Sequence, residues 1–158
     1  MAEGGLTTIT NPELTGELLV PEDNTEVAPR ELPEPKPADR HGWWWGTGRR
    51  KTAVARVRLR PAKEIGKGDI QVQINNNKFK TIDDYFSELR DRKDARAPLT
   101  ITDTMGTLDV FIRTHGGGYM GQAQAIRLGI ARALVNYDPT IEPALREAGY
   151  LSRDSRKV

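Results

Sequence analysis

The sequence contains no cysteine among its 158 residues. This absence excludes a disulfide framework and a thiolate-bound metal site, and it suits a reducing cytoplasm. No apolar run reaches the roughly 18 residues of a membrane-spanning helix. The amino-terminus lacks the basic start and apolar segment of a secretory signal, and it is too acidic for an organelle transit peptide. We therefore expect a cytoplasmic protein without a membrane partner.

Residues suited to catalysis or metal binding are also scarce. The two histidines, His41 and His115, lie far apart in the sequence and match no metal-ligand spacing. No grouping of serine, histidine and aspartate stands out. We expect no catalytic residue, no metal and no cofactor, and we interpret His115 as a turn residue bonded to backbone or to phosphate.

Charge is distributed unevenly along the chain. Residues 1–40 hold nine acidic and three basic side chains, a net charge of −6, whereas residues 41–158 hold 13 acidic and 21 basic ones, a net charge of +8. The first 40 residues also contain six of the ten prolines and show no sustained apolar periodicity. We expect residues 1–42 to form a disordered acidic extension, either a free tail or a docking motif. The basic body predicts a polyanionic partner.

The stretch from Ala53 to Arg60 alternates between two faces. One face holds Ala53, Ala55, Val57 and Leu59, and the other holds Val54, Arg56, Arg58 and Arg60. This pattern predicts a strand with one buried face and one cationic face, ended by Pro61. Because arginines without interleaved acids repel one another, contact with RNA or DNA phosphates is favoured over a merely solvated strand face.

Three further strands and three helices are predicted in the body. The expected strands are residues 69–75, antiparallel to the first strand, residues 99–104, and residues 108–114, which are apolar on both faces and therefore central. The first helix begins at the capping pair Thr81 and Asp84 and stops near Pro98. The second follows the glycines and ends at residues 138–139, and a short third one stops at Gly149. The adjacent tryptophans at positions 43–45 cannot all face one core if the chain is extended.

Three consecutive glycines, Gly116 to Gly118, separate the predicted strand 108–114 from the second helix. Strand, glycine turn and helix start together form a suitable seat for a phosphate group. The nucleotide-binding fingerprints do not fit. A phosphotransferase that uses this turn is the alternative hypothesis, although no magnesium ligand or base is evident beside it. Arg113 before the glycines, with Gln122 and Arg127 after them, favours an RNA backbone as the source of the phosphate.

Four segments together resemble a known family. They are Gly-Thr-Gly-Arg-Arg-Lys-Thr-Ala-Val-Ala-Arg-Val at residues 46–57, the three glycines, residues 121–134, and Leu-Ser-Arg-Asp-Ser-Arg at residues 151–156. In this order, over roughly residues 44–158, they closely resemble the bacterial small-subunit (30S) ribosomal protein nine family.

The resemblance implies an α+β domain, over residues 43–150, with a four-stranded sheet and helices packed on it, similar to domain two of ribosomal protein five. It also implies a ribosome-bound structural protein that carries out no chemistry. Such a protein would bind ribosomal RNA in the head of the small subunit, near the peptidyl-site tRNA and neighbouring head proteins.

The resemblance and the basic pattern together predict a set of RNA-binding residues: Gly46, Thr47, Gly48, Arg49, Arg50, Lys51, Arg56, Arg58, Arg60, Arg113, Gly116, Gly117, Gly118, Gln122, Arg127, Arg132, Arg153, Arg156 and Lys157. Two features depart from the family pattern. The acidic extension is not usual, and family members continue past the position of Val158 with a basic tail toward tRNA. We therefore interpret residues 151–158 as the start of a truncated tail and assign tRNA contact to no residue.

Overall fold

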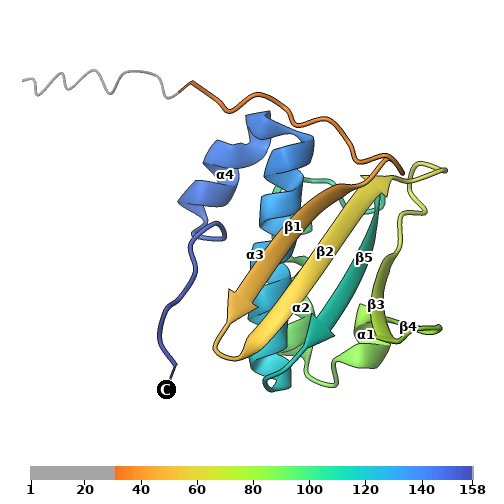
Figure 1. Cartoon of the computed structure of the whole chain (residues 1–158), viewed down its shortest axis with the longest axis vertical. Helices are drawn as coiled ribbons and strands as arrows, with labels where there is room; N and C mark the ends of the chain where they lie inside the picture. The colour runs from red at the N-terminus through yellow and green to blue at the C-terminus, as the bar shows by residue number, and fades with distance from the viewer. Residues whose placement is uncertain (1–30, 158) are drawn as a thin grey trace, which may run out of the picture. The chain divides into compact units, whose positions relative to one another are not determined.

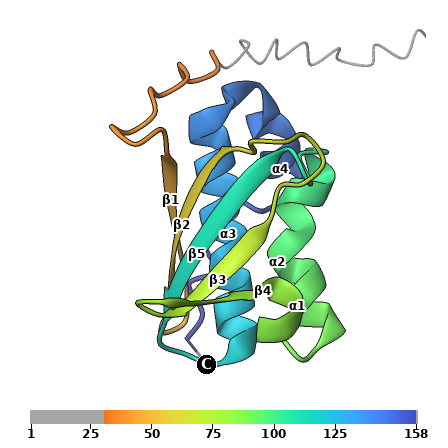
Figure 2. The ribbon, with the colours of Figure 1, turned by 90° about the vertical axis from the view of Figure 1, so that its right-hand side faces the viewer.

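The computed structural model describes residues 31–157, and most of the predicted acidic extension lies outside these residues. The described part is an α+β fold, as predicted. One mixed β-sheet is covered by helices on a single face. Figure 1 looks onto the uncovered face of the sheet with the long helices behind it, and Figure 2 shows the two layers from the side.

The sheet has five strands rather than the four that were expected. They are β1 (Trp44–Arg50), β2 (Ala53–Pro61), β3 (Ile70–Asn75), β4 (Lys78–Thr81) and β5 (Leu108–His115). Their spatial order is β1-β2-β5-β3-β4. The pairs β1–β2, β2–β5 and β3–β4 are antiparallel, whereas β3 and β5 are parallel. Strand β5 is central, as predicted, but the prediction that β3 runs antiparallel beside β2 is wrong, because β5 lies between them.

The prediction of a strand at residues 99–104 is also wrong. Helix α2 (Leu89–Ile101) continues through Pro98, which was expected to stop it. Ala95 and Leu99 are buried four residues apart on one side of α2, and Pro98 is buried beside them. Burial of this face outweighs the β-branched run of residues 100–102 and the backbone hydrogen bond that a proline removes.

The single helix predicted from Thr81 to near Pro98 is also divided, because residues 86–88 belong to neither α1 nor α2. The other helices agree better with the sequence pattern. Helix α1 (Ile82–Tyr85) is capped by Thr81, whose hydroxyl accepts a hydrogen bond from the Asp84 backbone amide at 3.3 Å. This confirms the predicted capping pair. Helix α3 (Tyr119–Tyr137) follows the glycines directly. A 3₁₀ turn η1 (Pro139–Ile141) and helix α4 (Glu142–Glu147) complete the set. No helix in the part of the chain from 31 to 157 has the length and apolar character to cross a membrane.

The core lies between the sheet and helices α2 and α3. Its largest fully buried side chains are Phe86, Leu59, Ile82, Leu99, Ile112, Ile126, Ile130, Leu134, Leu145, Val57, Val72 and Val110. Strand β2 contributes its predicted apolar face, and α3 contributes a buried stripe that includes Ile126, Ile130 and Leu134. Arg56 and the other basic residues of β2 are thereby directed to the uncovered face.

Strand β1 packs unusually close to α3. A Cβ atom added at Gly48 would lie 1.7 Å from the carbonyl oxygen of Ala125, and one added at Gly46 would lie 2.3 Å from that of Gly129. Gly129 in turn would meet Val57 Cγ2 at 2.7 Å, so this helical glycine also permits close packing. The lack of a side chain at Gly46, Gly48 and Gly129 therefore sets the distance between β1 and α3.

The three tryptophans at the start of β1 alternate between the two faces of the sheet. Trp44 packs edge-on against Tyr137, with ring centroids 5.0 Å apart, and its indole Nε1 donates to the carbonyl oxygen of Lys36 at 2.9 Å. Trp43 and Trp45 both lie beside Arg58 on the uncovered side. This arrangement confirms that the tryptophans do not share one core.

Candidate nucleic-acid interface

The uncovered face of the sheet brings four of the predicted residues together. Arg56 and Arg113 are directly paired across β2 and β5, and both are exposed. Arg58 lies opposite Phe111, and Arg60 lies opposite Asp109. Arg60 forms an ion pair with Asp109 at 3.3 Å, whereas within residues 31–157 Arg56 and Arg113 have no carboxylate partner. Two unneutralised cations directly opposite each other are unfavourable, so the pair is suited to hold an anion.

Aromatic rings surround these cations. The Arg58 guanidinium carbon lies 4.8 Å from the ring centroid of Trp43 and 5.5 Å from that of Phe111. Phe79 of β4 packs edge-on against Phe111 at 6.1 Å. Phe79 and Phe111 are not among the residues predicted from the sequence. Alternation along residues 108–114 placed Phe111 on the same face as Arg113 and could have identified it, whereas the unpredicted strand β4 left no such signal for Phe79.

The hairpin between β1 and β2 presents a second group of predicted residues. Thr47, Arg49 and Lys51 are exposed, and Lys51 occupies the turn with a positive φ of 52°. Gly46 and Gly48, in contrast, are buried against α3, where their lack of a side chain serves packing. Arg132 donates from Nη1 to the Thr47 carbonyl oxygen at 2.7 Å, so it covers the outer edge of β1 and does not join the uncovered face.

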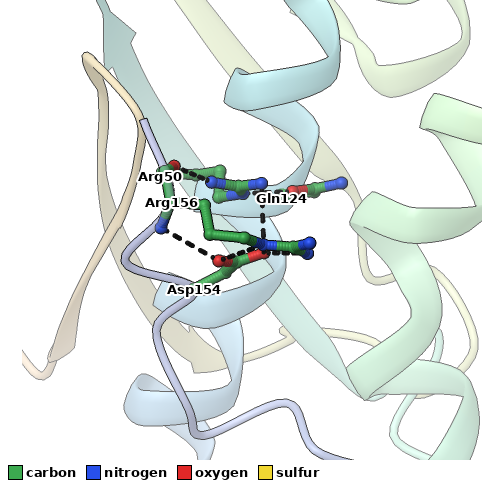
Figure 3. A network of polar contacts seen from close by, with 4 residues as sticks. All are labelled: Arg50, Gln124, Asp154 and Arg156. Carbon is green, nitrogen blue, oxygen red and sulfur yellow. Dashed lines mark hydrogen bonds and ion pairs between the residues drawn. The ribbon is translucent and has the colours of Figure 1, made fainter. Parts of the chain in front are cut away.

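Arg50 is engaged with the carboxy-terminal segment (Figure 3). Its Nε donates to Gln124 Oε1 at 2.7 Å, its Nη1 donates to the Arg156 carbonyl oxygen at 2.5 Å, and its Nη2 lies 3.1 Å from Asp154 Oδ2. Its side chain is only 11% exposed. Arg50 therefore holds residues 154–156 against the domain, a role that differs from the predicted RNA contact.

Asp154 is the centre of this contact. Its carboxylate accepts from the Arg156 guanidinium at 2.8 Å and from the Arg156 backbone amide at 3.0 Å. The hydrogen bond from the Arg156 guanidinium is the main reason that the pKa of Asp154 lies well below its usual range. The hydrogen bond from the Arg156 backbone amide and the nearby charges of Arg156 and Arg50 lower it further. The carboxylate is thus ionised wherever the protein is folded at ordinary pH.

A polar hollow of about 260 Å³ lies between this segment and α3. Five of the predicted residues line it: Arg49, Arg50, Arg127, Arg153 and Arg156. Arg127 is partly engaged, because it lies 3.7 Å from Asp94 and over the ring of Tyr150. Asp154 is the single acidic residue among those lining the hollow within the described chain, so a net positive charge remains. Lys157 lies exposed beyond it.

The glycine turn has the predicted strand–turn–helix geometry. Gly116 and Gly117 adopt positive φ values of 75° and 67°, and added Cβ atoms would meet Thr52 O at 2.6 Å and Ala53 Cβ at 2.9 Å. Both glycines are therefore required for packing on β2. Gly118 is the exposed N-cap of α3. Among residues 31–157, nothing lies within 4 Å of a Cβ atom added there, and no side chain caps the first turn of the helix. An accessible, uncapped helix start is compatible with an anion.

Gln122 holds this turn in place. Its Nε2 donates to the Gly116 carbonyl oxygen at 3.1 Å, and its Oε1 accepts from the Tyr85 hydroxyl at 2.5 Å. Both ends of the amide are thus occupied by protein groups. Gln122 thereby links the glycine turn to Tyr85 of α1, a contact that was not predicted from the sequence.

Comparison with known proteins identifies the family. Residues 48–158 match the model of the family described as ribosomal protein S9/S16. The small ribosomal subunit protein uS9 of Thermotoga neapolitana is 49% identical over 115 residues, which cover 73% of this chain and 81% of that protein. Its counterpart in Thermotoga maritima is 47% identical over the same shares of the two chains.

The chain belongs to the ribosomal protein S9/S16 family.

The S9/S16 match includes every predicted site residue except Gly46 and Thr47. In this family member the predicted residues form four groups: the arginines of the uncovered face, the β1–β2 hairpin with Arg132 beside it, the hollow beside the carboxy-terminal segment, and the glycine turn. No group of three or more histidine, aspartate or glutamate side chains that could hold a metal occurs within residues 31–157.

Proposed function

We propose that this protein is a structural constituent of the small ribosomal subunit and binds ribosomal RNA. The single observation that carries this proposal is the uncovered sheet face, where Arg56 and Arg113 are paired without a carboxylate partner in the described chain. A polyanion that follows the surface would neutralise them. The family membership and the names of the Thermotoga relatives support the same assignment.

The proposed mechanism is charge neutralisation combined with shape complementarity. Arginine forks on the sheet face and around the carboxy-terminal hollow contact phosphates, and the exposed helix start at Gly118 offers backbone N–H groups to another phosphate. The contacts position the domain on folded RNA and carry out no reaction. The role is therefore structural and not catalytic.

The finer assignment follows from the family resemblance. We place the protein in the head of the small subunit, near the peptidyl-site tRNA, beside neighbouring head proteins, on ribosomes in the cytoplasm. It supports translation there by stabilising the fold of the RNA.

Sucrose-gradient fractionation of cells that express the tagged full chain tests this function. We expect the protein to sediment with small subunits and with whole ribosomes. The double variant Arg56→Ala/Arg113→Ala is expected to shift a larger share to the top of the gradient, because it removes the unpaired cations and leaves the buried core unchanged. A wild-type protein found only in the soluble top fractions would overturn the proposal.

A further inference from the structure

The uncovered face of the sheet is hollowed into a groove that runs from β1 to the β3–β4 hairpin. Two adjoining hollows, of about 150 and 570 Å³, share Gln73 and Arg113 in their lining. The first lies among Trp45, Arg58 and Phe79, and the second extends past Lys78 and His115. We call these two hollows together the sheet groove.

The sheet groove is lined by cations and by no acidic residue of the described chain. Arg56, Arg113 and Lys78 form no ion pair within residues 31–157. Arg60, further along β2, differs from these three residues because it forms an ion pair with Asp109. A ligand that lies in the groove must therefore bring negative charge with it.

The groove also exposes flat aromatic surface, which phosphate binding alone does not require. Trp45 is 47% exposed and Phe79 is 46% exposed, on opposite sides of the groove. Between them, the Arg58 guanidinium carbon lies 5.8 Å from the Trp45 ring centroid and 5.5 Å from that of Phe111. Rings and guanidinium planes of this kind are stacking surfaces for planar groups.

We propose that the sheet groove binds a single-stranded stretch of RNA whose unpaired bases stack on Trp45 and Phe79 while Arg56, Arg113 and Lys78 hold its phosphates. This inference rests on the proposed function and adds the class of RNA. A duplex hides its base faces, so only an unstacked strand can use both the rings and the cations. Gln73 lines both hollows, and its Nε2 donates to the Asn76 carbonyl oxygen at 3.3 Å. Its Oε1 can accept a hydrogen bond from a base edge.

An equilibrium titration of the full chain with short oligoribonucleotides tests the proposal. Three probes of equal phosphate number are compared: an unstructured single strand, the same strand with abasic sugars, and a closed hairpin duplex. We expect the single strand to bind at least about tenfold more tightly than either of the others, because base–aromatic stacking adds to the phosphate contacts. We also expect tryptophan fluorescence to be quenched by the base-containing strand and not by the abasic one.

Two variants locate the site. Trp45→Ala and Phe79→Ala are expected to remove most of the advantage of the single strand over the abasic strand and to leave binding of the abasic strand unchanged. Tyr119→Ala is the matched control, because Tyr119 is an exposed aromatic residue at the start of α3 and does not line the groove. Circular dichroism of each variant checks that the fold is retained.

Equal binding of the single, abasic and duplex probes would overturn the inference, as would tighter binding of an acidic peptide of the same charge. Sedimentation of Trp45→Ala with small subunits in the gradient separates the two proposals. If the protein enters subunits and the probes show no base preference, the inference fails and the proposed function stands. If the wild-type protein does not enter subunits, the proposed function fails.

Discussion

At the scale of single residues, the glycines of this chain have different tasks that the sequence alone does not separate. Gly46 and Gly48 looked like part of a basic RNA-binding loop, but they are the contact between β1 and α3. Gly118, in contrast, has open space around it. A glycine carries no side chain to show periodicity, so only the packed structure distinguishes the two tasks.

The contact at Gly48 predicts a large loss of stability on substitution. Gly48→Ala places a methyl group 1.7 Å from a backbone oxygen of α3, so the helix must move away from the sheet. We expect the free energy of unfolding in urea to fall by at least about 3 kcal/mol.

Gly121→Ala is the matched control for Gly48→Ala. An added Cβ at Gly121, within α3, would meet its nearest neighbour at an ordinary 3.5 Å. We expect stability to stay the same or to rise by up to about 1 kcal/mol, because alanine favours the helix. Equal effects of the two substitutions would contradict the packing argument.

Asp154 gives a second prediction at this scale. Its folded pKa is lowered, chiefly by the Arg156 guanidinium, so its stabilising contribution is present above the ordinary value of about 3.9 and is lost as pH falls through the lower folded value. We expect ¹³C NMR titration of the Asp154 carboxyl group to show this lowered pKa, and Arg156→Gln to raise it toward the ordinary range.

Arg153→Gln is the control for this titration, because Arg153 is exposed and, in the described chain, forms no ion pair with Asp154. It is expected to leave the Asp154 pKa nearly unchanged. If both substitutions raised the pKa equally, general positive charge and not the specific hydrogen bonds would be its cause.

At the scale of elements, the sequence pattern predicts those with clear periodicity. Strand β2 alternates over eight residues, so it was identified together with its buried face. Helix α3 was identified by the glycine turn that precedes it and the aspartate–proline pair that follows it. Strand β1 was missed because glycines and adjacent tryptophans hide its alternation. The sequence of α2 was predicted as a helix that ends near Pro98 followed by a strand, because local propensity takes no account of the packing of α2 against α3. The cationic face could be predicted for the same reason as β2, whereas Arg50 and Gln122 depend on segments that meet only after folding.

The link between α1 and the glycine turn predicts an energetic coupling between two elements. The Tyr85 hydroxyl donates to Gln122, which holds the Gly116 carbonyl oxygen with its amide nitrogen. A double-mutant cycle with Tyr85→Phe and Gln122→Met, followed by urea unfolding, is expected to give a coupling of about 1 kcal/mol.

The same cycle with Tyr85→Phe and Gln124→Met provides the comparison, because Gln124 bonds to Arg50 instead. We expect these two changes to be additive within about 0.5 kcal/mol. Additivity in both cycles would show that the glycine turn keeps its shape without Tyr85.

At the scale of the whole molecule, charge is divided between the two ends of the chain and between the two faces of the sheet. The net charge of +2 conceals an acidic first segment and a body that carries +8. Within the body, the helices cover one face of the sheet, and the other face holds arginines that have no carboxylate partner in the described part of the chain. Composition predicted a polyanionic partner, but identifying the face that we propose for its binding required the register of β2 against β5.

This distribution predicts how RNA affinity depends on salt. Each phosphate neutralised by the protein releases counterions, so the logarithm of the binding constant for a small-subunit rRNA transcript should fall linearly with the logarithm of the salt concentration. Arg56→Ala and Arg113→Ala are each expected to reduce the magnitude of that slope by about one. Filter binding across a series of potassium chloride concentrations measures it.

Arg146→Ala removes the same charge from a different place. Arg146 lies on α4 and is paired with Glu142, away from the sheet groove. If the uncovered face carries the phosphate contacts, Arg146→Ala keeps the wild-type slope while Arg56→Ala and Arg113→Ala do not. If all three substitutions change the slope equally, affinity follows net charge alone, and the sheet face is not where the RNA backbone lies.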